Sequence, residues 1–278
     1  MNYPISILCR CLQVSKSGFY YWRNKPVSQS RKQNNLILYH VLQAYKLSRG
    51  TYGSPRIHHE LNAKGIRVGL NKIALMMKQH GIYARASMKH KKVKIARNTK
   101  GFAMNVLDRK FSADKPNEKW VSDTTFIPTR QGWLYLATIL DLYSRKIVGW
   151  SMSKHNDTDL VKTALIMATK NKPRQQAVLL HSDQGSTYRA DKYLSLFKRN
   201  NIQQSMSAKG NCHDNAVAES FFNTLKTELI HGQTYRTMEH AKRSIFEYIE
   251  VFYNRIRRHS TLNYQSPENF EKAFYNTN

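Results

Sequence analysis

Acidic residues are scarce in this chain. Its 278 residues include 18 aspartates and glutamates against 45 lysines and arginines, so the net charge is +27. An excess of that size is more than an enzyme with a neutral substrate needs, and it predicts attraction to a polyanion, of which nucleic acid is the commonest. Composition alone leaves a ribosome-associated or secreted cationic protein as the alternative.

Cysteines and long apolar runs are also lacking. The three cysteines, Cys9, Cys11 and Cys212, are too few for a disulfide framework. Cys9 and Cys11 do not combine with His58 and His59 at the spacing of a zinc site, so we expect no structural zinc. No apolar run approaches the roughly 18 residues of a membrane span, and the first residues lack a signal-peptide pattern. We therefore expect a cytoplasmic protein without membrane contact.

The positive charge is concentrated in the amino-terminal part. Residues 1–110 contain 22 lysines and arginines and only two acids, Glu60 and Asp108, whereas residues 111–278 contain 23 and 16. This division predicts that a DNA-binding part is joined to a second part with a different role. The basic run at 85–100 is expected to be a linker that follows a DNA backbone.

Two helical units are expected in the amino-terminal part. Residues 4–24 fit a short helix-turn-helix in which Ser15 caps the second helix, and two packed helices without DNA contact are the alternative. The next unit is expected to contain three helices. The first covers about 34–47, the second begins with Ser54 as its cap, and the third covers about 72–80 with Asn71 as its cap. This unit fits a second helix-turn-helix, for which we assign DNA contacts to Arg56, Lys72 and Lys78.

The rear half changes to strand patterns. Three strands followed by alternating helices and strands are typical of a mixed α/β sheet. The expected strands cover 119–128, 133–141, 146–152, 177–180 and 202–206, and the expected helices cover 157–170, 189–199, a segment from near Asp214, and 238–256.

Two aspartates stand where strands do not favour them. Asp123 interrupts an alternating strand and shares a face with Val121, Thr125 and Ile127, so its carboxylate needs a metal ion or an arginine as partner. Asp183 ends an apolar strand before a glycine-containing turn, which is where open α/β sheets build their sites.

A third acid, Glu219, lies on the helix that begins near Asp214. Helical spacing places Asn215, Glu219, Asn223 and Lys226 on one stripe, with Lys226 about 10 Å beyond Glu219. Glu219 can therefore hold a metal ion while Asn223 and Lys226 contact DNA. An isolated aspartate or glutamate is more often salt-bridged, but three together suit a hard cation such as Mg²⁺.

Other polar residues near these acids are given structural roles. Asp141 is expected to order a turn, and Asp214 to cap a helix. His181 and His213 flank the site, where they would order substrate or move protons unless structural hydrogen bonds satisfy them. The His-Ser-Asp run that begins at His181 is not a hydrolytic triad, because adjacent strand residues point to opposite faces.

The spacing of the acids and the sequence motifs around them resemble those of a known family. Thirty-five residues separate Asp183 from Glu219, and Lys226 follows seven positions later, as in the D,D(35)E signature of retroviral integrases and related transposases. The sequence is similar to the insertion-sequence-three family over nearly its whole length, in the runs 52–57, 120–127, 140–150, 181–186, 210–222 and 253–267.

The resemblance implies a ribonuclease H-like α/β fold, a mixed five-stranded sheet with flanking helices, preceded by all-α helix-turn-helix units. It implies a DNA transposase in which Asp123, Asp183 and Glu219 are catalytic and hold two Mg²⁺ ions, with Mn²⁺ as a substitute. A chain of this length resembles the family's second-reading-frame product, which implies the upstream-frame product as partner or fusion, and a homo-oligomer on bacterial nucleoid DNA. The domains would be 1–30 (helix-turn-helix-like), 31–98 (DNA-binding helix-turn-helix), 99–114 (basic linker) and 115–274 (catalytic).

Two other functions stay open on the sequence. A non-catalytic DNA-binding regulator of transposition fits the composition and the amino-terminal half equally well. A ribonuclease H-type nuclease would share the fold but leaves the basic helical units unexplained. Metal-dependent joining of DNA strands distinguishes a transposase from both.

Overall fold

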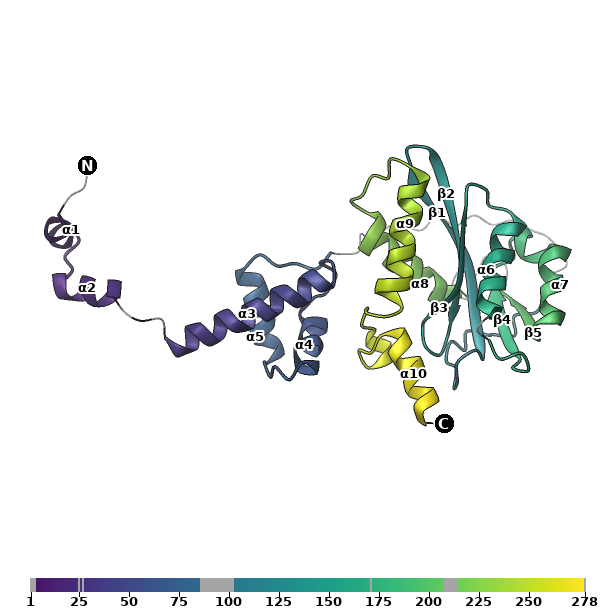
Figure 1. Ribbon diagram of the computed structural model, residues 1–278, viewed down its shortest axis with the longest axis horizontal. Coiled ribbons are helices and arrows are strands. Elements are labelled where there is room, and N and C mark those ends of the chain that lie inside the picture. Colours follow the sequence, from purple (N-terminus) through teal and green to yellow (C-terminus); the bar gives the residue numbers. More distant parts are fainter. Residues whose placement is uncertain are drawn as a thin grey trace. The chain divides into compact units, whose positions relative to one another are not determined.

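The chain divides into two compact units, Met1–Tyr83 and Ala84–Asn278, which are drawn in Figure 1. The computed structural model describes residues 4–24, 26, 28–85, 103–170, 172–207 and 215–277. Within those ranges, no helix has both the length and the apolar character needed to span a bilayer.

The first unit is helical throughout its regular structure. Its helices are α1 (Ile5–Cys11), α2 (Lys16–Asn24), α3 (Gln29–Leu47), α4 (Ser54–Ala63) and α5 (Leu70–Gln79). Helices α3, α4 and α5 pack on one another. Their shared core consists of Ile37, Val41, Ala44, Ile57, Leu61, Ile73 and Met77.

Glycines, rather than polar side chains, precede α4 and α5. Gly53 and Gly69 occupy the extended N-cap positions, so the predictions of Ser54 and Asn71 as caps are wrong, and both residues lie in the first helical turn. Glycine at an N-cap costs only a few tenths of a kcal/mol relative to serine, because water can reach the first N–H groups. Ser15 does cap α2, since its Oγ accepts the Gly18 N–H at 3.0 Å.

The second unit is built on a five-stranded mixed sheet in the order β3-β2-β1-β4-β5. Its strands are β1 (Lys119–Thr129), β2 (Gly132–Asp141), β3 (Ile147–Ser153), β4 (Val178–Ser182) and β5 (Ile202–Met206). The first three strands pair antiparallel, whereas β4 lies parallel to β1 and β5 parallel to β4. The predicted mixed sheet with flanking helices is confirmed.

Helices cover both faces of the sheet, as Figure 1 shows. One face carries α6 (Thr158–Lys170) and α7 (Asp191–Arg199), and the main core around Trp120 lies beneath them. The other face carries α8 (Ala216–Leu225) and α9 (Met238–Phe246). The first half of β1 is therefore covered on both sides.

Two π-helices, the short 3₁₀ helices η1 (Ser186–Arg189) and η5 (Ser260–Leu262), and a final helix complete this unit. The π-helix η3 (Lys226–Ile230) continues α8, and the π-helix η4 (Glu247–Tyr253) continues α9. Helix α10 (Pro267–Thr277) follows. The sequence predicted helices over the regions of η3 and η4, but neither α10 nor the π turns, which take one extra residue per turn and often occur at functional sites.

Part of the predicted organisation lies outside the described residues. This applies to the basic run at 85–100 apart from Arg85, and to the start of the expected linker at 99–114. It also applies to Cys212, His213 and Asp214, so the predicted cap at Asp214 is not among the described features. Helix α8 begins at Ala216, two residues later than expected.

Candidate active site

Asp123 lies on β1 and faces the side of the sheet that carries α8. Val121, Thr125 and Ile127, which alternate with it on the same face, are buried, as the strand pattern predicted. Its Oδ1 accepts the Thr124 N–H at 2.7 Å. Burial raises the pKa of Asp123 to about 7, with the charge of Asp183 as the second cause.

Asp183 follows the last residue of β4, as expected for the carboxyl end of a strand. Its side chain is exposed, and Oδ1 accepts the Gly185 N–H at 2.9 Å, which fixes the turn. In the parallel pairing of β1 and β4, Val121 is opposite His181. Two residues further along each strand direction stand Asp123 and Asp183, so the topology places these two carboxylates side by side.

Glu219 reaches the same place from α8. It is partly exposed, while Ala218, Phe221, Phe222 and Leu225 hold the helix by their buried side chains. The negative charge of Glu219 contributes to the raised pKa of Asp123, so the two carboxylates are within electrostatic reach of one another.

Lys226 is the cation of this cluster. It is the first residue of η3, and its charge favours the ionised form of Asp123. Burial lowers the pKa of Lys226, and Asp123 opposes that effect. Its Nζ also lies 5.2 Å from the centre of the Phe126 ring. The structure thus brings Asp123, Asp183, Glu219 and Lys226 together.

The other predicted DNA-binding residues fall in two places. Asn223 is exposed on α8, one turn before the cluster's lysine. Lys72 and Lys78 are exposed near opposite ends of α5, in the first unit. Arg56 is partly buried on α4, with its guanidinium 5.7 Å from the centre of the Tyr52 ring. The residues of the first unit are therefore not part of the carboxylate cluster.

Asn215 has a different position from the one predicted. It is the N-cap residue of α8, is buried, and does not continue the exposed stripe of Glu219. Its Nδ2 donates to the Ser122 carbonyl oxygen at 3.2 Å, which ties the start of α8 to β1 beside Asp123. On the opposite face, Ser122 Oγ donates to Tyr188 Oη at 3.2 Å. Helical spacing could not reveal either contact, because both depend on tertiary packing.

Asp141 orders its turn, as predicted. Its Oδ1 accepts the N–H groups of Tyr143 and Ser144 at 2.9 and 2.8 Å, and its Oδ2 accepts that of Asn117 at 2.7 Å. Burial raises the pKa of Asp141, and these donors act in the opposite direction. A carboxylate with this many backbone partners is accounted for without a metal ion.

His181 is held by structural hydrogen bonds. Ser205 Oγ accepts the N–H groups of Val106 and Leu107, both at 3.0 Å, so its own hydrogen points to His181 Nδ1 at 2.9 Å. His181 is fully buried, and the adjacent Ser182 Oγ donates to the Asp183 carbonyl oxygen at 3.1 Å. The structural alternative is therefore correct for His181, and no hydrolytic triad is present at this run.

The carboxylates of Asp123, Asp183 and Glu219 suit a hard cation, although in this structure they are not close enough to one another to share one ion. Among the described residues, no three histidine, cysteine or acidic side chains stand close enough to share a metal ion. The carboxylates of Asp183 and Glu219 are exposed and partly exposed, so a change of side-chain rotamer moves them. Carboxylate oxygens are the protein ligands that Mg²⁺ prefers.

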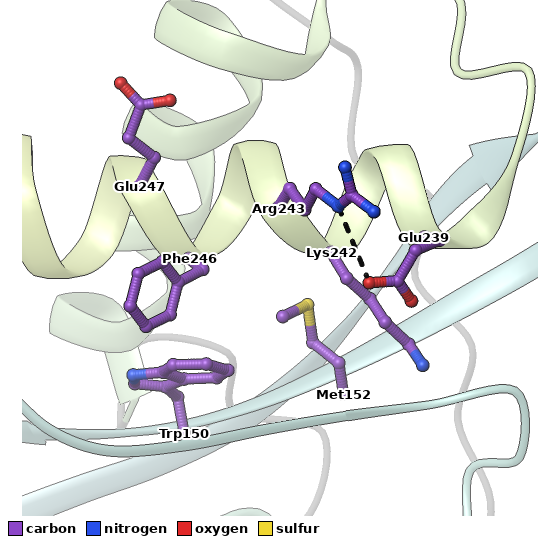
Figure 2. Close-up of a pocket in the computed structure, with 7 residues that line it drawn as sticks. All are labelled: Trp150, Met152, Glu239, Lys242, Arg243, Phe246 and Glu247. Atoms are coloured by element: carbon purple, nitrogen blue, oxygen red, sulfur yellow. Dashed lines mark ion pairs between the residues drawn. The ribbon is translucent and has the colours of Figure 1, made fainter.

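A separate open groove of about 570 Å³ lies between β3 and the helix formed by α9 and η4 (Figure 2). In this groove the ring centroids of Trp150 and Phe246 are 5.9 Å apart, and Arg243 Nε lies 3.8 Å from Glu239 Oε1. The sheet register places Trp150 two strands away from Asp123. None of the three clustered carboxylates lines the groove, so it is distinct from the candidate site.

Family models match most of the chain. A model described as integrase core domain matches residues 113–212, and a second with the same description matches residues 219–274. A model described as HTH-like domain matches residues 32–92.

Curated proteins match over almost the full length. Transposase InsF for insertion sequence IS3A of Escherichia coli (strain K12) is 40% identical over 274 residues, which are 97% of this chain and 94% of InsF. The transposase for insertion sequence element IS904 of Lactococcus lactis subsp. lactis (strain IL1403) is 39% identical over 249 residues, 88% of this chain and 97% of that protein.

Solved structures show weaker likeness. The HTLV-2 integrase catalytic core domain in complex with magnesium has a TM-score of 0.43 and 14% identity, over 58% of this chain and 99% of its own. A chain of the simian T-cell lymphotropic virus intasome in complex with PP2A regulatory subunit B56 gamma has a TM-score of 0.47 and 12% identity. The match covers 79% of this chain and 74% of that chain.

Proposed function

Because this chain belongs to the insertion-sequence transposases of the IS3 family, we propose that Asp123, Asp183 and Glu219 are its catalytic residues and hold two divalent metal ions. The protein is a DNA transposase, a polynucleotidyl transferase that breaks and joins DNA strands.

The placement of Asp123 and Asp183 on neighbouring parallel strands, with Glu219 within electrostatic reach on α8, is the observation that carries the residue assignment, and the raised pKa of Asp123 agrees with it. Burial and the negative charges of Asp183 and Glu219 all disfavour its ionised form, and Lys226 only partly offsets them. Three acids gathered in this way repel one another, whereas bound cations would remove the repulsion. Burial is the largest cause and acts on Asp123 alone, whereas the effects of Asp183 and Glu219 require those carboxylates to lie near it.

The metal ions would activate the attacking oxygen and stabilise the leaving oxygen of an in-line phosphoryl displacement, and Mg²⁺ is the ion proposed, with Mn²⁺ as a substitute. The three carboxylates would hold them from β1, from the end of β4 and from α8. Asn215 and Tyr188 fix the backbone and side chain of Ser122, next to Asp123. The protein's part is to hold these oxygens in place and to orient the DNA.

Two displacements use the same residues. Water attacks the phosphorus at the element's end, the bond to the 3′ oxygen breaks, and a 3′-hydroxyl is released. That hydroxyl then attacks a phosphorus in another strand, whose own 3′ oxygen leaves. Lys226 holds a phosphate oxygen beside the carboxylates in both steps, and Asn223, exposed on the same helix, donates to the DNA backbone.

The first unit is proposed to recognise the ends of the element. Lys72 and Lys78 on α5 would contact phosphates, and Arg56 on α4 would contact DNA beside them. The proposed domains remain 1–30, 31–98, 99–114 and 115–274. We also propose a homo-oligomer on nucleoid DNA, with the upstream-frame product as partner or fusion.

Replacement of Asp183 tests the residue assignment. Asp183→Ala removes one metal ligand, so strand joining on DNA with the element's ends should fall on the order of 10³-fold or more in Mg²⁺. A gel mobility assay should show DNA binding within about twofold of the wild type, because the basic surface is unchanged.

Asp191→Ala provides the matched control. Asp191 is an exposed aspartate at the start of α7, outside the cluster, and its replacement should leave joining within about twofold. Joining that persists in Asp183→Ala would refute the assignment of this carboxylate. A wild-type protein that binds these ends but never joins them in Mg²⁺ or Mn²⁺ would contradict the proposed site as a whole.

A further inference from the structure

An exposed aromatic pair lies on the hairpin formed by β1 and β2. Phe126 and Trp133 are 52% and 51% exposed, and their rings meet edge to face with centroids 4.9 Å apart. Pro128, opposite Trp133 in the register, is also exposed. Large aromatic side chains held together at a surface indicate a contact face for a ligand.

The hairpin that carries the pair is fixed at its turn. Arg130 N–H donates to the Tyr235 carbonyl oxygen at 2.9 Å, and the Gln131 side-chain oxygen accepts the Met238 N–H at 2.9 Å. Thr129 forms a β-bridge with Tyr235. The segment before α9 therefore holds the turn, and the two rings are presented by a rigid support.

Lys226 links the aromatic pair to the carboxylates. Its Nζ lies over the Phe126 ring at 5.2 Å from the centroid, and the same charge acts on Asp123. Phe126 is three residues after Asp123 on β1, about 10 Å along the strand, and alternation turns their side chains to opposite faces, so Lys226 is the residue that connects the ring with the carboxylate.

Resting on the function proposed for the carboxylates, we propose that Phe126 and Trp133 are positioning residues that stack with an unpaired DNA base near the reacting phosphate. Every base has a face that stacks on an aromatic ring, whatever its identity. Lys226 lies between the Phe126 ring and the carboxylates. It binds a phosphate of the same DNA strand whose base stacks on the ring. The net charge of +27 favours a nucleic acid as the occupant over a second copy of this chain.

A base stacked on these rings would make it easier for the DNA backbone to reach the proposed metal ligands. A phosphodiester inside a duplex is constrained by the stacking of its own bases, and unstacking one of them costs free energy. Stacking on Phe126 and Trp133 offsets that cost, so the backbone can bend toward the metal ligands without losing all base contacts.

Photocrosslinking without metal ions tests the contact independently of catalysis. 5-Iodouracil is placed at successive positions around the cleavage site of an element-end duplex, and the complex is irradiated in EDTA. Crosslinks at one or two positions should map to Phe126 or Trp133 and disappear in Phe126→Leu/Trp133→Ala. Crosslinks that map only to other residues would overturn the proposal.

Joining kinetics test the role. Trp133→Ala and Phe126→Leu should each lower the joining rate about tenfold on paired DNA, while Trp133→Phe and Phe126→Tyr, which keep a ring, should stay within about threefold of the wild type. On DNA with an abasic site at the crosslinked position, wild type and Trp133→Ala should join at equal rates, because no base needs a partner. Tyr275→Ala, a 51% exposed tyrosine on α10, is the control and should be unchanged.

The outcomes separate this inference from the proposed function. If Asp183→Ala retains joining, the catalytic assignment fails even where crosslinks map to the aromatic pair. If Asp183→Ala is inactive but Trp133→Ala joins paired DNA at the wild-type rate, the stacking proposal alone fails. It also fails if Trp133→Ala changes the oligomeric state in sedimentation while DNA crosslinks persist, which would assign the face to a second copy.

Discussion

The raised pKa of Asp123 has a consequence for stability. A carboxyl group with a pKa of 3.8 in the unfolded chain and about 7 in the folded chain binds more protons when folded. This contribution to stability is fully present below about pH 4 and is lost as the pH rises through about 7. In the absence of metal ions, the site therefore destabilises the fold at neutral pH and above.

Asp123→Asn should remove that dependence. In EDTA at pH 8, the variant should melt a few degrees above the wild type, and the difference should vanish near pH 4. Adding Mg²⁺ at pH 8 should raise the melting temperature of the wild type but not that of the variant. Thermal denaturation followed by circular dichroism measures both effects, and equal melting temperatures of the two metal-free proteins at pH 8 would contradict the burial argument.

Single residues differed in how well the sequence predicted them. Asp141 was predicted correctly because its role is local: a short carboxylate before a turn accepts the N–H groups two and three residues later. Asn215 was placed wrongly because its partner, the Ser122 carbonyl oxygen, is 93 residues away in sequence. Clustering of Asp123, Asp183 and Glu219 could be predicted only through spacing and family resemblance.

At the scale of elements, a buried ion pair joins the π-helix η3 to the chain after η4. Arg257 and Glu228 are 4% and 8% exposed, with Arg257 Nη2 2.8 Å from Glu228 Oε1. Tyr248 Oη on η4 donates to Glu228 Oε2 at 2.7 Å. These bonds hold the helix on which Lys226 stands.

Arg257→Ala should therefore be strongly destabilising. It leaves the buried carboxylate of Glu228 without its cation, at a cost of about 3–5 kcal/mol in the free energy of unfolding. Arg255→Ala is the matched control, since that side chain is 64% exposed and pairs with Glu268 at 3.5 Å, and its loss should cost less than about 1 kcal/mol. Urea denaturation compares the two, and equal losses would show that burial does not govern the ion pair.

Elements with local signals were predicted well. The hairpin of β1 and β2 has alternating side chains and a short turn, and its strand limits agree with the pattern within a residue or so. The π turns of η3 and η4 were missed, because one extra residue in a turn is stabilised only by packing around it. Gly53 and Gly69 were missed as caps because polar side chains stood one or two residues later and gave the stronger local signal.

At the scale of the whole molecule, the uneven charge predicts how salt affects DNA binding. Met1–Tyr83 contains 13 lysines and arginines against one acid. A protein that neutralises several phosphates loses affinity steeply as salt rises, with a slope of about −0.9 per phosphate in a double-logarithmic plot. Residues 84–278 alone should show a slope shallower by about 3 or more than the full chain. Fluorescence anisotropy with duplex DNA between 50 and 200 mM salt measures it, and equal slopes would place the main phosphate contacts in the second unit.

The two-part character of the chain was visible in the sequence because charge and periodicity change together. The structure also divides into two units, Met1–Tyr83 and Ala84–Asn278, although this boundary lies before the change of charge at residue 110. The sheet order β3-β2-β1-β4-β5 was not readable from pattern alone, since parallel pairing of β1 with β4 brings together strands separated by two other strands and a helix. Family resemblance supplied what periodicity lacked.

The order of the two units along the chain has a consequence in time. A ribosome adds about 5–20 residues per second, and domains generally fold as they emerge, the amino-terminal one first. The helices up to α5 are complete long before Glu219, which follows Tyr83 by 136 positions. For roughly 7–27 s, each nascent polypeptide thus has its helix-turn-helix-like unit but not the third of the proposed metal ligands. It can hold DNA near the place of its own synthesis before it is able to cut.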